Sequence, residues 1–455
     1  MNRPPAVDAA RRVAYATVLA VETDRAYANL LLPRLLRESS AEERDAAFAT
    51  EIAYGTLRWQ GVLDQVLAHG STRPVEALDP QVRAVLRTGA YQLLRMRVPA
   101  HAAVHASVQL ARAVVGERVA GFVNAVLRRV AERDWAGWVE ELAPQDSVGR
   151  LAFAAGSPRW VAQAMADALD GDLSQLEAAL AEDRPVTHLV ARPGRITRDE
   201  LLAAAGPHAT PAPWSPFAVR LAGGDPAAVA PVREGRAAVQ DEGSQLAALV
   251  LARAGEAAEG ERWLDICAGP GGKAALLAGL LPAGGRLLAA DLHPHRARLV
   301  AGAVSGAAAD VVTADGTRPP WRPGTFDRVL VDVPCTGLGA LRRRPEVRWR
   351  RQPADVVALA SLQERLLVEA IDSARPGGLV AYVTCSPHPA ETRAVVERAI
   401  AARPSTERVD ARLFLPELPD LGPGPDVQLW PHLHGTDAMY LALLRSGVSP
   451  GSPDP

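Results

Sequence analysis

All three cysteines and the only lysine of this 455-residue chain lie between positions 267 and 385. Each cysteine stands where a short apolar run ends: WLDIC ends at Cys267, VLVDVPC at Cys335 and LVAYVTC at Cys385. Of the 50 lysines and arginines, Lys273 is the single lysine. Short apolar runs predict buried parallel strands, and ligands bind just beyond the carboxyl ends of such strands. Three thiols and one amine at these positions therefore predict an active site.

A glycine-rich turn, ICAGPGGK, follows the first of these strands. Gly269, Gly271 and Gly272 let a ligand approach the backbone closely, but the pattern is neither a dinucleotide fingerprint nor a phosphate loop. The next two strands end in Asp291, placed to hydrogen-bond a ribose, and Asp315, within reach of an adenine amino group. Tight packing of helix against strand would explain the glycines but not the acids. An adenosyl ligand without a phosphate site indicates S-adenosylmethionine rather than NAD or ATP.

Two further thiols end neighbouring predicted strands beside this turn. A lone buried cysteine is usually an inert small hydrophobe, whereas a pair next to a cofactor site favours catalysis. Methylation of a pyrimidine at carbon 5 needs a thiolate, because carbon 5 becomes nucleophilic only after the thiolate adds to carbon 6. Asp332, before the second cysteine, is placed to hydrogen-bond N3 and the exocyclic amine of the ring. Spacing alone does not tell which of Cys335 and Cys385 attacks.

The composition is that of a globular protein with more than one domain. Hydrophobic residues make up 48% and charged residues 22% of the chain, and its length predicts two or three domains. Periodicity predicts an all-helical domain over residues 1–140 and a small α+β linking module over 141–245. Residues 246–447 alternate strands with helices, which predicts a mostly parallel sheet wrapped on both faces. Residues 448–455 read as a disordered tail.

Several classes of protein are disfavoured by the same composition. Three cysteines are too few for a disulfide scaffold, and no spacing typical of a metal site occurs. No apolar run is long enough to span a membrane, and the amino-terminal residues lack the core of a signal peptide. We therefore expect a cytoplasmic protein without metal or membrane partner. The net charge of -2 means that any affinity for RNA must come from local clusters of arginine.

The densest basic run follows the Pro-Cys motif directly. Arginine pairs with phosphates, and a tryptophan among arginines offers a face on which a base can stack. The RNA-binding residues predicted here are Arg342, Arg343, Arg344, Arg348 and Trp349. The alternative is a solvated charged loop.

Six segments, taken together, resemble the successive motifs of the Nop/Sun family of RNA 5-methylcytosine methyltransferases. They are VQDEGSQLAALVL, LDICAGPGGKAALLAGLL, DLHPHRARL, TADGT, DRVLVDVPCTGLGALRRRPEVRW and YVTCSPHPAE. The all-helical amino-terminal domain resembles NusB, which points to the bacterial RsmB/Sun branch that acts on 16S ribosomal RNA. The resemblance implies a multidomain fold, with a NusB-like domain, the linking module and a Rossmann-like class I methyltransferase domain.

The resemblance also implies roles for individual residues. Cys385 would be the nucleophile, and Cys335 would assist release of the methylated product. The cofactor residues that it implies are Cys267, Ala268, Gly269, Pro270, Gly271, Gly272, Lys273, Asp291, Arg296, Asp315 and Asp332. The chain departs from the family pattern after the nucleophile motif, where Glu391 and Thr392 stand in place of Glu-Asn.

We therefore predict a monomeric enzyme that transfers a methyl group from S-adenosylmethionine to carbon 5 of a cytosine in RNA, with 16S ribosomal RNA as substrate. A DNA cytosine methyltransferase would attack with Cys335 instead of Cys385. A protein glutamine or DNA amino methyltransferase would need Asn-Pro-Pro-Tyr where Asp-Val-Pro-Cys stands. Two alternatives stay open: a methyltransferase for another RNA, and a NusB-like RNA-binding or transcription factor with a vestigial methyltransferase domain. The complete set of acids and thiols argues against such decay.

Overall fold

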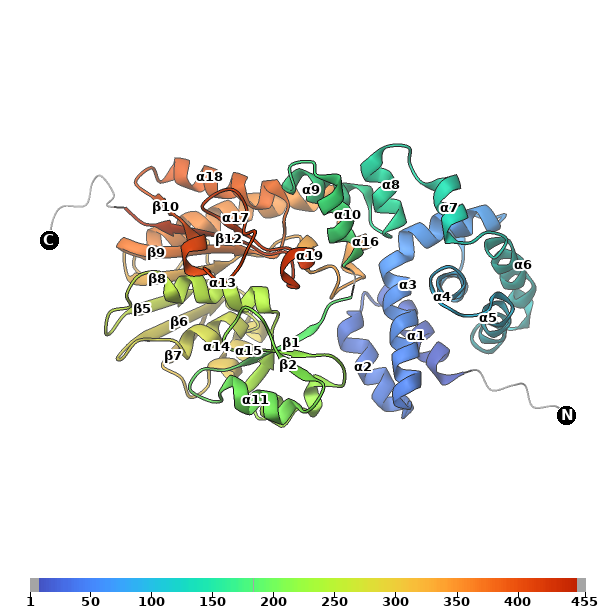
Figure 1. Ribbon diagram of the computed structural model, residues 1–455, viewed down its shortest axis with the longest axis horizontal. Helices are drawn as coiled ribbons and strands as arrows, with labels where there is room; N and C mark the ends of the chain where they lie inside the picture. The colour runs from blue at the N-terminus through green and yellow to red at the C-terminus, as the bar shows by residue number, and fades with distance from the viewer. Residues whose placement is uncertain (1–7, 183, 448–455) are drawn as a thin grey trace. The chain divides into compact units, whose positions relative to one another are not determined.

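The computed structural model describes residues 8–182 and 184–447, and these form two compact units (Figure 1). The first unit runs from the amino-terminal side of the chain to residue 183 and takes in a later segment, Leu341–Gln352. The second unit holds the remaining chain. The predicted disordered tail, residues 448–455, lies outside the described residues.

The first unit has helices and no strand among its described residues. They are α1 (Ala9–Thr23), α2 (Ala28–Ser39), α3 (Glu43–Gly70), α4 (Pro80–Arg95), α5 (Ala100–Val114), α6 (Ala120–Val130), α7 (Trp135–Leu142), α8 (Ser147–Ala154), α9 (Arg159–Ala168), α10 (Leu173–Ala181) and, from the later segment, α16 (Val347–Arg350). Apolar side chains at helical spacing build its core, where Leu63 and Val66 of α3 are buried with Val85 and Leu127. The prediction of an all-helical domain is confirmed, and the helices continue past residue 140.

A small antiparallel sheet opens the second unit, with strand order β2–β3–β1–β4. Its elements are β1 (Thr187–Ala191), α11 (Arg198–Ala205), β2 (Ala209–Pro211), β3 (Ala218–Leu221), α12 (Ala230–Arg233) and β4 (Ala237–Val239). The predicted linking module, residues 141–245, is therefore divided between the two units: its helices belong to the first and its sheet to the second. Periodicity identifies helices and strands singly, and it does not say which core each one joins.

The large sheet of the second unit has the order β10–β12–β9–β8–β5–β6–β7, with β11 paired to β12. The neighbours from β9 to β7 are parallel, and the pairs of β12 are antiparallel. Its strands are β5 (Arg262–Asp265), β6 (Arg286–Asp291), β7 (Ala309–Thr313), β8 (Phe326–Asp332), β9 (Ala374–Thr384), β10 (Glu407–Val409), β11 (Val427–Gln428) and β12 (Tyr440–Arg445). The helices of this unit are α13 (Glu242–Arg253), α14 (Gly272–Ala278), α15 (Pro294–Val304), α17 (Pro353–Ser373), α18 (Arg393–Ala402) and α19 (Pro431–His434).

Alternation along the strands divides the core of the large sheet between its two faces. Trp263 and Leu330 pack with residues of α13, α14 and α15, whereas Leu264 and Val329 pack with residues of α17 and α18. The predicted sheet with helices on both faces is thus confirmed. Because both faces are covered, a ligand has access at the edge where the parallel strands end.

The described residues hold neither a membrane-spanning helix nor a cluster of metal ligands. None of the helices in residues 8–182 and 184–447 is long and apolar enough to cross a membrane. Within the same ranges, no three or more His, Cys, Asp or Glu side chains are grouped so that they could hold a metal ion.

Candidate active site

Cys335 and Cys385 lie at the carboxyl ends of two adjacent parallel strands. β8 ends at Asp332 and β9 at Thr384, and the register of the pair sets Asp332 opposite Val383. Each cysteine follows its strand closely, so the two Sγ atoms stand 3.3 Å apart. The structure therefore brings together the two thiols that the sequence singles out, close enough to reach a single pyrimidine ring.

The contact between the sulfurs divides their proton affinities. When one sulfur is a thiolate, the S–H of the other donates a hydrogen bond to it. This hydrogen bond lowers the pKa of Cys335 and raises the pKa of Cys385. Burial raises the pKa of Cys385 further. The contact is symmetric, so the donor and the acceptor can exchange. The ammonium of Lys273 acts on Cys385 in the opposite direction, toward the thiolate. The pair therefore carries one negative charge more readily than two.

Lys273 reaches this edge from the first turn of α14. Its Nζ donates to the carboxylate of Asp332 at 2.8 Å, and only 9% of the lysine is exposed. Burial opposes the charge on Lys273, but the attraction of Asp332 outweighs it and raises the pKa of the ammonium. The structure thus joins two predicted site residues that stand 59 positions apart in the chain.

Two groups at the end of β5, buried Asp265 and half-buried Cys267, favour their neutral forms. Burial, reinforced by the nearby charge of Asp332, raises the pKa of Asp265 to about 8. Neither carboxyl oxygen of Asp265 has a hydrogen-bond partner of normal geometry among the described residues. Burial and the same acids also raise the pKa of the Cys267 thiol. Cys267 is therefore placed as a wall of the cofactor turn and not as a third thiolate.

The glycine-rich turn is held by the strand that follows it. Asp291 accepts hydrogen bonds from the backbone N–H groups of Gly269, at 3.0 Å, and His293, at 2.9 Å. A Cβ at residue 269 would lie 2.3 Å from Asp291 Oδ2 and 2.6 Å from Arg296 Nε, so both side chains would have to shift to admit one. Gly271 has φ of 112°, and a Cβ on it would meet Ala303 at 2.7 Å. These contacts explain two of the three glycines by packing.

Arg296 and Asp315 lie at the border of the same site. The guanidinium of Arg296 donates to the backbone oxygen of Gly269 and stands 3.4 Å from the carboxylate of Asp291. Asp315 is exposed, and hydrogen bonds from the hydroxyl and N–H of Thr317 lower its pKa. Arg296 therefore fastens the turn, while Asp315 faces outward, where a ligand can reach it.

S-adenosylmethionine fits the residues that surround this turn. The buried oxygens of Asp265 need donors of the kind that an amino group or a hydroxyl supplies, and the glycines leave the backbone open to close approach. The residues of the turn itself are Cys267, Ala268, Gly269, Pro270, Gly271, Gly272 and Lys273. Lys273, the last residue of the turn, contacts Asp332, and the charges of both act on Cys385, so a methyl donor bound here would be near the thiols.

The predicted RNA-binding run is largely packed against the first unit, whereas arginines open to phosphates were expected. Arg342 and Arg348 are buried, each with 7% exposure, and Arg348 donates to the backbone oxygen of Gly156 at 2.9 Å. The indole N–H of Trp349 donates to the backbone oxygen of Arg58, also at 2.9 Å. Arg342 and Arg348 therefore do not lie on an open surface, and RNA binding by the run stays a prediction.

The physical reason is that arginines can satisfy the carbonyls that a helix leaves unpaired at its end. Arg350 donates to the backbone oxygens of Val21, in the last turn of α1, and Ala26, both at 2.8 Å. Arg343 is half-buried, and Arg344 is exposed. Density of charge in a sequence does not distinguish arginines that face phosphates from arginines that face helix ends.

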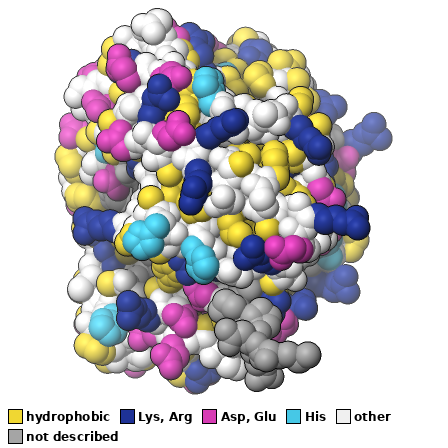
Figure 2. All heavy atoms as spheres, turned by 90° about the vertical axis from the view of Figure 1, so that its right-hand side faces the viewer, with side chains coloured by type: hydrophobic (Ala, Val, Ile, Leu, Met, Phe, Trp, Pro, Cys, Tyr) yellow, Lys and Arg dark blue, Asp and Glu magenta, His cyan; other side chains and the backbone are white. Residues whose placement is uncertain are grey.

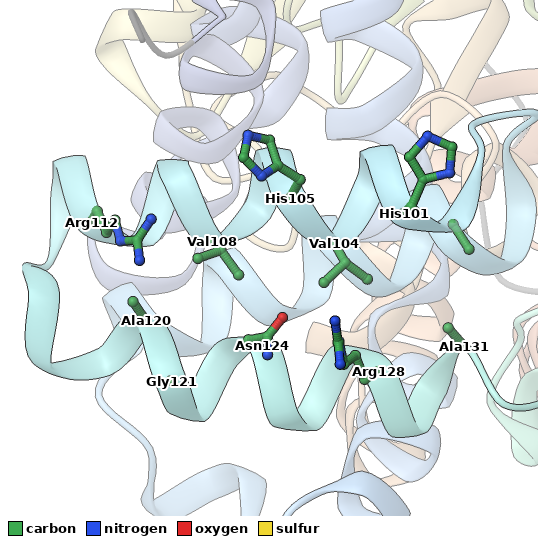
Figure 3. Close-up of a pocket in the computed structure, with 11 residues that line it drawn as sticks. His101, Val104, His105, Val108, Arg112, Ala120, Gly121, Asn124, Arg128 and Ala131 are labelled. Atoms are coloured by element: carbon green, nitrogen blue, oxygen red, sulfur yellow. The ribbon is translucent and has the colours of Figure 1, made fainter. Parts of the chain in front are cut away.

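A groove of about 760 Å³ lies in the first unit between α5 and α6 (Figure 3). His101 and His105 project from α5, and Asn124 and Arg128 from α6. Arg112, at one end, is paired with Glu117 at 3.0 Å. Figure 2 shows arginines on this side of the molecule scattered among acidic and apolar side chains. The groove is therefore a local basic feature and not part of a continuous basic surface.

One group of buried polar residues beside the thiols received no role from the sequence. The residues are Thr336, Gln363, Tyr382, Ser386 and Glu391, and all are buried. Glu391 lies at the centre, where it accepts hydrogen bonds from Thr336, Gln363 and Ser386. The available signal was a glutamate six residues after the nucleophile motif's cysteine, but its partners stand too far along the chain for spacing to reveal them.

Comparisons with known proteins agree with this architecture. A model of the family described as 16S rRNA methyltransferase RsmB/F matches residues 252–445, and the NusB family matches residues 8–132. A putative methyltransferase of Mycobacterium tuberculosis is 54% identical over 96% of this chain and 97% of its own length. Ribosomal RNA small subunit methyltransferase B of Pseudomonas syringae is 35% identical over 88% of each chain. The crystal structure of PH0851 superposes with a TM-score of 0.79, at 21% identity, over 98% of this chain and 99% of that one.

Proposed function

This chain belongs to the RsmB/F family of 16S rRNA methyltransferases, and on that premise we propose that it methylates carbon 5 of a cytosine through a covalent adduct with Cys385. It is an S-adenosylmethionine-dependent RNA methyltransferase. Our proposal adds the atom that is methylated, the attacking residue, 16S ribosomal RNA as the substrate, and action as a monomer.

The pair of thiols carries this proposal. A methyltransferase that modifies a nitrogen or an oxygen uses the lone pair of its substrate and has no need of a thiolate. Carbon 5 of cytosine lacks such a lone pair, so a nucleophile must first add to carbon 6. Cys385 and Cys335, 3.3 Å apart beside the Lys273–Asp332 ion pair, match that requirement.

The proposed reaction begins when the thiolate of Cys385 adds to carbon 6 and forms an Sγ–C6 bond. The electron pair moves to carbon 5, which takes the methyl group. S-adenosylmethionine, when bound, would supply this methyl group from its sulfonium, whose methyl–sulfur bond breaks to leave a neutral thioether. A base then removes the proton of carbon 5, and the Sγ–C6 bond breaks to restore the aromatic ring. Cys335 assists this last step, so that the methylated RNA leaves and Cys385 is regenerated.

Asp332 and Lys273 would orient the ring during these steps. A carboxyl group beside cytosine can hydrogen-bond N3 and the exocyclic amine, which stabilises the charge that develops as the thiolate adds. Lys273 holds the carboxylate of Asp332 at 2.8 Å and also favours the thiolate of Cys385. One cation would thus serve both the nucleophile and the group that binds the ring.

The turn from Cys267 to Lys273 would hold the cofactor, together with the acids that follow it. Asp291 and Asp315 would accept hydrogen bonds from the ribose and the adenine, respectively. Arg296 would act indirectly, because its guanidinium already fastens Gly269 and Asp291.

RNA contacts are proposed for the more accessible basic residues. In the run after the Pro-Cys motif these are Arg343 and Arg344, because Arg342 is buried and the side chains of Arg348 and Trp349 donate to backbone oxygens of the first unit. Arg128, exposed on the wall of the groove between α5 and α6, is a further contact that we propose for a phosphate.

Mapping 5-methylcytosine in ribosomal RNA tests the proposal. Bisulfite sequencing of 16S RNA from a strain that lacks the gene should show one cytosine converted that is protected in the parent. Complementation with the wild-type gene should restore protection, and Cys385→Ala should not. Protection that is unchanged in the deletion strain, or lost in another RNA, would reject 16S RNA as the substrate. Protection restored by Cys385→Ala would reject the covalent mechanism.

A further inference from the structure

The residues that follow the two cysteines meet on one buried carboxylate. Thr336 follows Cys335, and Ser386 follows Cys385. Glu391, which is fully buried, accepts a hydrogen bond from the backbone N–H of Thr336 at 2.8 Å. Its other oxygen accepts hydrogen bonds from the Thr336 hydroxyl and, at 2.6 Å, from the Ser386 hydroxyl. Glu391 thus joins the turn after β8 to the turn after β9, beside a direct contact of 3.2 Å between the Thr336 and Ser386 hydroxyls.

A neighbouring amide holds the other side of the first thiol. Gln363, on α17, donates through Nε2 to the backbone oxygen of Pro334 at 2.9 Å and to Glu391 at 3.0 Å. Tyr382, inside β9, donates its hydroxyl to the backbone oxygen of Glu391 at 2.6 Å. The residues on both sides of Cys335 are therefore tied to the same buried group.

This arrangement costs free energy that packing alone would avoid. A carboxylate without exposure must have its lost hydration replaced, and apolar residues of similar volume would pack there without that cost. The pKa of Cys335 is lowered chiefly by its hydrogen bond with Cys385, and the Glu391 charge acts against that lowering. What the carboxylate provides is a fixed acceptor for donors from two separate turns.

We propose that Glu391 is a positioning residue, which sets the separation of the two catalytic sulfurs by holding Thr336 and Ser386 together. This inference rests on the proposed function in one respect, namely that both thiols act on the same cytosine. A displacement of about 1 Å can cost on the order of 100-fold in rate, because the reacting atoms lose alignment. Glu391 would thus act on the rate through the thiols, without touching the ring.

The test is Glu391→Gln in the full-length protein. The amide has the same shape and can still accept from the Thr336 N–H, but it turns one acceptor into a donor toward the two hydroxyls. We expect bridging of Cys335 to Cys385 by dibromobimane, identified by peptide mapping, to slow about tenfold or more, and kcat to fall by on the order of 10- to 100-fold. The Kd of S-adenosylmethionine should stay within about twofold of wild type, because the cofactor turn is untouched.

Glu261→Gln is the matched control. Glu261 is also a buried glutamate with three donors, but it lies before β5, at the opposite end of the strand. It should lower the melting temperature while leaving the bridging rate and kcat near wild type. If Glu391→Gln bridges its thiols at the wild-type rate, or keeps kcat near wild type at a lowered melting temperature as the control does, the positioning role is wrong.

Two milder variants keep the test decisive if Glu391→Gln does not fold. Thr336→Val and Ser386→Ala each remove one hydroxyl donor to Glu391, and each should slow bridging, with a smaller effect than Glu391→Gln. Wild-type bridging in both would overturn the inference. Because bridging needs neither RNA nor methyl transfer, its outcome is separate from that of the proposed function. A wild-type protein that methylates no cytosine would reject the function, whereas unaltered bridging in the variants would reject only the role of Glu391.

Discussion

The buried acids at the two ends of β5 differ in their hydrogen bonds and in the direction of their pKa shifts. At the start of the strand, Glu261 accepts hydrogen bonds from Arg328, Trp263 and Ala258 at 2.6–2.9 Å, and these contacts outweigh burial and lower its pKa. At the other end, Asp265 is buried without such partners, and its pKa is raised to about 8. A satisfied buried acid indicates a structural role, whereas an unsatisfied one at a ligand-binding edge indicates a ligand. The difference separates an edge of the sheet that maintains the fold from an edge that carries chemistry.

The largest effect is expected at the chemical edge. Cys385→Ala should reduce methyl transfer to the background level, because no thiolate remains to activate carbon 6. The affinity for S-adenosylmethionine, measured by calorimetry, should stay near wild type, and Glu261→Gln serves as the control with activity retained. Turnover close to wild type in Cys385→Ala would show that the edge carries a different reaction.

Cys335→Ala, at the same edge, should separate the attack of Cys385 on the ring from the release of the methylated RNA. Cys385 should still attack and the methyl group should still transfer, but elimination should stall. We expect a covalent adduct between RNA and protein that survives denaturing electrophoresis and disappears in the double mutant with Cys385→Ala. An adduct formed by Cys385→Ala and absent from Cys335→Ala would exchange the roles of the two thiols, as in a DNA-type enzyme.

At the edge that maintains the fold, a substitution should change the stability of the protein and leave its activity unchanged. Glu261→Gln removes the charge that Arg328 faces, and Arg328 is only 2% exposed. Leaving a buried guanidinium without its ion-pair partner should lower the free energy of unfolding by about 3 kcal/mol. Urea unfolding measures this change. A loss of turnover larger than the loss of folded protein would contradict the separation of the two edges.

The last prediction concerns the pH dependence of stability. Because the pKa of Asp265 is raised to about 8 in the folded protein, the folded state binds its proton more tightly than the unfolded chain, where the pKa is about 4. The contribution of Asp265 to stability should therefore be complete below about pH 4 and decline as pH rises to about 8. Asp265→Asn should flatten this decline in the cofactor-free protein. Parallel curves for the two proteins between pH 4 and pH 8 would contradict the assignment.

The strands and thiols of the large sheet could be predicted because their signals are local. An apolar run that ends in a cysteine predicts both a strand and the side of the sheet on which the thiol lies. Cys335 and Cys385 were placed together in this way, and Asp332 with them. The pairing of Lys273 with Asp332 is seen only in the structure. The resemblance implies that both residues are near the cofactor, but it does not imply that they contact each other.

Other features depend on distant partners and gave no local signal. Glu391 meets Thr336 across 55 positions, and Arg348 meets Gly156 across 192. The first compact unit extends beyond the predicted helical domain, residues 1–140, for a similar reason. Helices α8 to α10 have the same periodicity as those before them, and only the packing shows that they share a unit.

The docking of residues 341–352 has a consequence for how the protein is made. The first unit is not complete in its first 183 residues, since Trp349 fills the space above Gly61 and Arg350 caps the end of α1. On the ribosome, the early helices emerge long before these side chains do. The nascent helical unit must therefore persist without the contacts of Trp349 and Arg350 until residue 352 of 455 has been synthesised. A protein truncated after residue 183 would lack these contacts permanently.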